Sequence, residues 1–182
     1  FVTAESASTP SILAATNYAI TLNTGQTATV SQANTWDAAN GTGVITATIS
    51  GGAASTLATL TGTGNAYTVT VTDASAAASA LNTIDAATTV TVVATGVGTI
   101  TGTAAAIATA ISATDIDTAG DVIATVDAGS ASAADLNTID ANTTVAVGAT
   151  VVTTITGNTS DVAAFVTAES ASTPTISAAT NY

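Results

Sequence analysis

LNTIDAATTVTVVATGVGTITGT, at residues 81–103, recurs without a gap as LNTIDANTTVAVGATVVTTITGN at residues 136–158. In each copy, the LNTID segment precedes a stretch in which β-branched residues alternate with small or polar ones. This period of two is typical of a strand with one buried face. A recurrence of this kind indicates an array built from repeated structural units, which we therefore expect to stack on one another.

Similar alternating runs occur at intervals along most of the chain, at 44–50, 67–73, 88–94, 122–128 and 143–149. Ala-rich segments with helical spacing separate several of these runs, at 54–60, 104–111 and 132–140. Ser or Thr stands just ahead of several segments and predicts helix N-caps at Thr103, Ser132 and Thr159. Asp135 and Asp161 would then lie in first helical turns, where the helix dipole favours a carboxylate.

Strand, short helix and strand at roughly 20 to 30 residues per coil predict a mainly β fold, an elongated parallel β-solenoid with short helices in its coils. A fully β right-handed helix is a close alternative, because TIT at 99–101 and 154–156 adds second short strands. A chain of Ig-like β-sandwich repeats is a further alternative. Sandwiches need tight antiparallel turns, and Asn40-Gly41 is the one such signal.

The two ends of the sequence are near-copies of each other. Residues 165–182 restate residues 1–18 with two differences, Ser11/Thr175 and Leu13/Ser177. We therefore expect a chain taken from a longer array, in which 1–164 is one repeat. Its expected parts are an irregular segment or small subdomain at the repeat junction (1–43), solenoid coils with the internal period seen in the LNTID copies (44–164) and the start of the next repeat (165–182).

Composition excludes several classes of function. The chain has 12 acidic residues, no Lys, Arg or His, and a net charge of −12. Binding of nucleic acid depends on cationic side chains, so no nucleic-acid partner is expected. The His, Cys and Lys that most often act as catalytic bases or nucleophiles are missing, which predicts that the chain is not an enzyme. The longest apolar run, at 104–111, is too short to span a bilayer, so no membrane insertion is expected.

Three segments carry a family resemblance: LNTIDAATTV (81–90), TITGTAAAIATAI (99–111) and NAYTVTVTDAS (65–75). In them the chain resembles tandem repeats of giant secreted or surface proteins of bacteria, notably marine cyanobacteria, over roughly 44–166. The resemblance implies a non-catalytic array, exported by type I secretion and displayed as an adhesin, surface layer or fibre. The GGxGxD calcium-binding nonapeptides that are common in such exported proteins are absent from this chain.

Asp115, Asp117 and Asp121 form the densest acidic cluster, in the segment TDIDTAGD. Asp115 and Asp117 match positions 1 and 3 of an EF-hand-type loop, and Gly120 matches its position 6. Position 5 is Ala119 and position 12 is Val126, so two ligands of that loop are missing. The cluster predicts either a solvated loop or a weak Ca²⁺ site, and no other cofactor is expected.

The LNTID copies place Asp85 and Asp140 at equivalent positions, with Asp73 and Asp127 upstream of them. Because they recur, these carboxylates are better explained as turns or caps than as an active site. Asn82 and Asn137 suggest a stacked amide ladder inside the turns. An exposed Trp36 would favour stacking on a sugar, whereas a buried Trp36 would favour plain packing.

These features together predict a structural repeat of an extracellular filament, sheath, surface layer or giant adhesin. Its expected partner is itself, as neighbouring repeats and as copies in a polymer, and its expected location is extracellular or at the cell surface. The absence of sulfur and of sites for cleavage after Lys or Arg suits that location. The alternative is a carbohydrate- or ice-binding solenoid module, since regularly placed Thr residues could order water.

Overall fold

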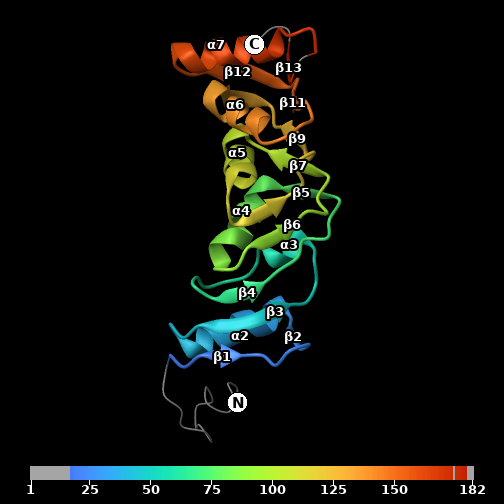
Figure 1. Cartoon of the computed structure of the whole chain (residues 1–182). Coiled ribbons are helices and arrows are strands. Elements are labelled where there is room, and N and C mark those ends of the chain that lie inside the picture. The colour runs from blue at the N-terminus through green and yellow to red at the C-terminus, as the bar shows by residue number, and fades with distance from the viewer. Residues whose placement is uncertain (1–16, 174, 180–182) are drawn as a thin grey trace, which may run out of the picture.

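The computed structural model of the chain describes residues 17–173 and 175–179. Helices and strands follow one another along an elongated molecule from the N-terminal to the C-terminal end (Figure 1). The helices are α2 (Val30–Asn40), α3 (Ala54–Leu57), α4 (Ala78–Ala87), α5 (Ala104–Ser112), α6 (Ala133–Ala141) and α7 (Thr159–Glu169). The strands are β1 (Ile20–Thr21), β2 (Thr27–Ala28), β3 (Ile45–Ile49), β4 (Ala66–Thr68), β5 (Ser75–Ala77), β6 (Val92–Ala94), β7 (Thr99–Gly102), β8 (Ile116–Thr118), β9 (Ile123–Val126), β10 (Gly129–Ser132), β11 (Val147–Ala149), β12 (Val152–Thr156) and β13 (Ile176–Ala178).

All strand pairings within the described residues are parallel. The longest run of neighbours is the five-stranded sheet with the order β13-β11-β9-β7-β5. In it Ser75 pairs with Thr99, and Thr99 pairs with Ile123 at the same interval in sequence. A parallel partner at this spacing requires a crossover between the two strands, and a helix provides it.

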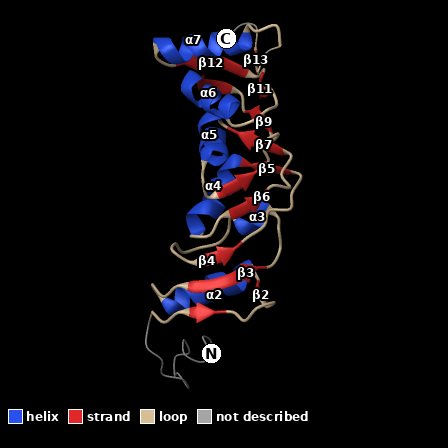
Figure 2. Cartoon of the chain, in the orientation of Figure 1, coloured by secondary structure: helices blue, strands red, loops and turns tan. Residues whose placement is uncertain are grey.

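A unit of one to three short strands followed by a helix therefore recurs along the chain, and we call this unit a layer. Helices of successive layers are neighbours: α3 with α4, α4 with α5, α5 with α6, and α6 with α7. Figure 2 shows α4, α5, α6 and α7 following one another on one side of the molecule, with strands on the other side. The described chain is thus a mixture of helices and parallel sheets.

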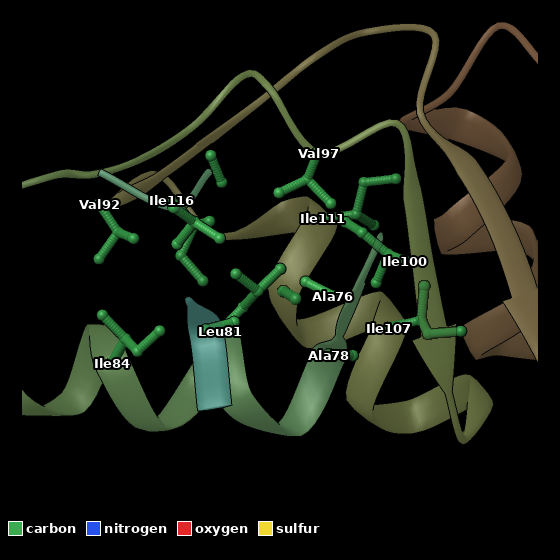
Figure 3. Packing of buried hydrophobic residues seen from close by; sticks show 14 of the residues in the cluster. Ala76, Ala78, Leu81, Ile84, Val92, Val97, Ile100, Ile107, Ile111 and Ile116 are labelled. Atoms are coloured by element: carbon green, nitrogen blue, oxygen red, sulfur yellow. The ribbon is translucent and has the colours of Figure 1, made fainter. Parts of the chain in front are cut away.

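The core lies between the helices and the strands and is continuous across layers. Leu81 and Ile84 of α4 point toward β-strand residues such as Ile100 and Val92, and all four are fully buried (Figure 3). Ile107 extends the cluster into the next layer. Burial of each such side chain contributes about 1.5 to 3 kcal/mol, so the apolar contacts stabilise each layer through its neighbours.

The prediction of a mainly β fold matches the structure only in part. Every described helix except α3 has 9 to 11 residues, whereas the strands have 2 to 5. The helical segments are rich in Ala, which favours helices, and turns take up part of the predicted strand runs. Parallel pairing leaves no place for the antiparallel Ig-like alternative, and the recurring helices leave none for the fully β alternative.

Individual predicted segments vary in how well they correspond to the observed elements. The run at 44–50 forms β3, whose residues alternate between buried and exposed as predicted. The run at 67–73 forms only the short β4 and an isolated bridge from Thr70 to Val93. The Ala-rich run at 104–111 forms α5. No described helix is long and apolar enough to cross a membrane.

The predicted helix starts agree with the structure at two of three N-cap positions, Thr103 and Ser132. Thr103 caps α5 by accepting a hydrogen bond from the Ala106 amide at 3.2 Å. Ser132 occupies the N-cap position of α6, but its side chain makes no capping bond within the described structure. The N-cap of α7 is Asn158, one residue before the predicted Thr159. Asp135 and Asp161 do lie in first helical turns.

The N-terminal part of the described chain joins the same parallel arrangement. Strands β1 and β2 both pair with β3, so residues on either side of the boundary drawn at residue 43 share one sheet. A capping box, in which Thr29 and Gln32 satisfy each other's backbone amides, starts α2. The division into 1–43, 44–164 and 165–182 stays a prediction.

Candidate functional site

The most regular polar feature of the chain is the motif Asn-Thr-x-Asp on every second helix. It stands at 34–37 in α2, 82–85 in α4 and 137–140 in α6. In all three helices Asn is the fifth residue and Asp the eighth. The fifth residue is Ala in α5 and α7, namely Ala108 and Ala163. We call α2, α4 and α6 the Asn-type helices, and α5 and α7 the Ala-type helices.

Two of the motif Asn side chains donate a hydrogen bond from the carboxamide to the next helix. Asn82 Nδ2 donates to the Ala106 carbonyl oxygen at 3.0 Å, and Asn137 Nδ2 donates to the Asp161 carbonyl oxygen at 3.0 Å. Both acceptors are the third residue of the following helix. Each bond contributes about 0.5 to 1.5 kcal/mol net. The motif therefore forms a bracket between an Asn-type helix and the Ala-type helix that follows it.

Asn34 makes the corresponding bracket at the N-terminal end of the stack. Its Nδ2 donates to the Thr59 carbonyl oxygen at 2.8 Å, and its Oδ1 accepts from the Thr61 amide at 2.9 Å. One carboxamide thus satisfies two backbone groups of the segment that follows α3. The same helical position serves the same purpose in three layers.

The brackets differ from the predicted amide ladder. Asn82 and Asn137 do not stack on one another, because α5 lies between α4 and α6 (Figure 1). A ladder needs an amide in consecutive layers, whereas here an Ala-type helix intervenes. The Oδ1 of Asn82 is buried and accepts no hydrogen bond from the described residues.

In α2 and α6, the motif Asp at the eighth position accepts a hydrogen bond from the loop that follows the next helix along the chain. Asp37 Oδ1 accepts from Asn65 Nδ2 at 2.7 Å, and Asn65 Oδ1 in turn accepts from the Ile45 amide at 2.9 Å. Asn65 is only 2% exposed, so this chain of bonds satisfies a buried amide. At Gly62, which has φ +84°, a Cβ would run into the Asp37 carboxylate. Asp140 Oδ2 accepts from the Thr175 hydroxyl at 3.1 Å.

Asp85 is the motif carboxylate with a perturbed pKa. Burial raises its pKa above the ordinary value, and the negative charge of Asp115 in the following layer raises it further. Burial and the neighbouring charge therefore both disfavour the ionised state of Asp85. The chain has no cationic side chain to relieve that repulsion.

Asp73 and Asp127, the two upstream acids, occupy different surroundings. Asp73 Oδ2 accepts from the Ala54 amide at 2.5 Å and so caps the N-terminus of α3 from the following layer. The N-cap residue of α3 is Ala53, whose side chain cannot form this bond. Asp127 is exposed beside α5 and borders a shallow recess with Ala77 and Thr103. The cap interpretation of the repeated acids is therefore confirmed at Asp73.

The predicted calcium ligands lie on the surface around β8. Asp115, Asp117 and Asp121 are all exposed, with Ile116 buried between the first two. Within the described residues, no group of three or more acidic side chains is arranged to hold a metal ion. The Ca²⁺ site stays a prediction.

A surface groove lies between α2 and α3, with a volume of about 800 Å³. Its described lining consists of uncharged residues, among them Asn34, Thr35, Thr56 and Thr59. Trp36 is half-buried and packs against the core, which favours a packing role over a sugar-stacking one.

Asn34 and Asn65 are structural residues that were not predicted from the sequence. The signal for Asn34 was present, since NTWD at 34–37 shares its Asn, Thr and Asp with the two LNTID copies. The first two motifs are closer together in the sequence than the second and third, so a search for an exact period does not find the first one. Asn65 lacks a sequence signal, because its partners Asp37 and Ile45 come from two preceding segments.

We expect Asn82→Ala to lower the free energy of unfolding by about 0.5 to 1.5 kcal/mol, because it removes the hydrogen bond from the Asn82 carboxamide to the Ala106 carbonyl of the next helix. Thr83→Ala is the matched control, since this neighbouring hydroxyl is exposed and bonds only within its own helix, to Ser79. Chemical denaturation followed by circular dichroism measures both. Equal effects of the two substitutions would contradict the bracket.

The pH dependence of stability reports on Asp85. Because its folded-state pKa is raised, the folded chain binds this proton more tightly, and ionisation destabilises the fold as the pH rises through that pKa. We therefore expect Asp85→Asn to raise the Tm at pH 7. The gain should vanish at about pH 3, below the ordinary Asp pKa of about 3.9. Thermal unfolding across this pH range measures the effect.

The control for this prediction is Asp117→Asn, which removes the same charge from an exposed position of β8. Asp115→Asn should give part of the Asp85→Asn gain, because Asp115 is the second cause of the shift in the Asp85 pKa. If Asp85→Asn stabilises no more than Asp117→Asn at pH 7, the local origin of the effect is wrong.

Comparison with protein-family models, with curated proteins and with solved structures finds no match to this chain. The described chain is a series of parallel layers, and the Asn-type helices join successive layers by brackets.

Proposed function

We propose that the chain is a non-catalytic structural repeat of an extracellular filament, sheath, surface layer or giant adhesin, built as an elongated solenoid. The observation that carries this proposal is the parallel pairing of each paired strand with strands of adjacent layers. Such an architecture grows along one axis by addition of layers, and each layer contacts only its neighbours.

The polar brackets support a mechanical role. Asn34, Asn82 and Asn137 each join one layer to the next through side-chain-to-backbone hydrogen bonds. Because these bonds cross layers, they oppose separation of the layers along the long axis. An elongated structural element needs such bonds in successive layers, so their recurrence at the same helical position is expected. A single binding site does not need this recurrence.

The charge of the chain supports an extracellular location. All charged side chains are acidic, and the motif carboxylates Asp37, Asp85 and Asp140 recur along its length. A uniformly negative shaft repels parallel shafts at low ionic strength, and divalent cations can bridge such shafts. The lack of Lys and Arg removes the sites of trypsin-like proteases, and the lack of sulfur removes the most readily oxidised side chains.

Electron microscopy of the native material with immunogold labelling tests this function. We expect gold particles along filaments, sheaths or lattices outside the cell, with an axial repeat. Labelling with antibody preabsorbed on the purified chain is the control. Gold confined to the cell interior, or to isolated globular particles, would contradict the proposal.

A further inference from the structure

The outward face of α7 is an apolar surface at the C-terminal end of the stack (Figure 1). Val162, Ala163 and Val166 line a hollow of about 600 Å³ there, together with Gly157, Asn158 and Thr159. Val166 is 44% exposed, which is unusual for a large aliphatic side chain among these helices. None of these lining residues carries a charge.

The other Ala-type helix shows what normally covers such a face. Ala108 and Ile111, the fifth and eighth residues of α5, are each 6% exposed, and α6 packs against α5. The fifth and eighth residues of α7 are Ala163 and Val166, which have the same apolar character but are exposed. The face of α7 is therefore equivalent to a face of α5 that is buried in the stack, where the Asn-type α6 packs against α5.

Alternation of the two helix types specifies the kind of helix that fits. Within the described chain, the Ala-type α5 is followed by the Asn-type α6, and an Asn-type helix should follow α7 in the same way. The Asn-type helix at the opposite end of the stack is α2, which is followed by α3 but preceded by no described helix. Stacking of α2 on α7 would continue the alternation without a break.

The sequence places these two helices next to each other in a tandem copy. Residues 165–182 restate residues 1–18, so α7 runs into the start of a second copy of the repeat. In this chain, the residues that follow position 18 form β1 and then β2 and α2. The same order after residue 182 would bring a second α2 to the face of α7.

We propose that the outward face of α7 is the junction between repeats and that it is occupied by α2 of the following copy. This inference rests on the proposed function and adds to it the surface and the partner segment. The junction buries Ala163 and Val166, just as their counterparts Ala108 and Ile111 are buried within the stack. The stack then continues across the repeat boundary. Separate domains would instead be connected by a flexible linker.

Thiol labelling tests the junction, because the chain has no Cys. Val166→Cys is introduced into the single chain and into the first copy of a tandem protein, 1–182 followed by 19–182. Reaction with 5,5′-dithiobis(2-nitrobenzoate) at low protein concentration measures accessibility. We expect labelling at least about tenfold slower in the tandem protein, because a buried thiol reacts only after local opening. Equal rates in the two proteins would overturn the proposal.

Two further variants keep this result interpretable. Ser79→Cys, at an exposed position of α4, should label equally fast in both proteins. Thr35→Pro in the second copy disrupts the interior of its α2 and should restore fast labelling of Val166→Cys. Labelling that stays slow would show that another segment covers α7, and would overturn the assignment to α2. If Val166→Cys fails to fold, as judged by circular dichroism, Ala163→Cys replaces it.

The two proposals fail in different ways. Fast labelling in the tandem protein, combined with labelled filaments in the native material, would remove the stacked junction and leave the structural function. Slow labelling without any filament, sheath or lattice would keep the junction and remove the function.

Discussion

Parallel pairing between layers is the constraint on which the rest of the structure depends. Most strands have only 3 to 5 residues, too few to be stable alone, and their backbone groups find partners one layer away. The equal spacing of β5, β7 and β9 along the sequence fixes how much chain each layer holds. A large part of that chain is the helix that closes the crossover, so helix length and strand register are set together.

Two kinds of interface between helices account for the long sequence period. Asn82 and Asn137 join an Asn-type helix to the next Ala-type helix by hydrogen bonds. Helices α5 and α6 also pack on one another, and the apolar Ala108 and Ile111 of α5 are buried. Because the interfaces alternate, the sequence repeats every two layers. The two LNTID copies therefore lie on α4 and α6, with α5 between them.

Local patterns revealed much of the fold, and long-range contacts explain what they did not reveal. The alternation of VITATIS predicted β3, and the Ala-rich run at 104–111 predicted α5, because side-chain period and helix propensity are local properties. The helix content of the chain was underestimated, because the segment of α2 has no strong apolar period. Hydrogen bonds support this helix instead, from Thr29 at its start and from Asn34 along its side.

The polar residues also differ in how far the sequence alone predicts their contacts. Asn65 could not be predicted, because its partners come from segments that only the folded layers bring together. The acidic cluster at 115–121 is exposed on the surface around β8, and its Ca²⁺ site stays a prediction.

Small-angle X-ray scattering of the 182-residue chain tests the layered, elongated architecture most directly. A compact chain of this length has a radius of gyration of about 16 Å and a symmetric distribution of interatomic distances. Stacked layers predict a larger radius of gyration and an asymmetric distribution with a long tail, both unchanged on dilution. A radius near the compact value with a symmetric distribution would show that the parallel strands belong to a globular fold, and would contradict the layered stack.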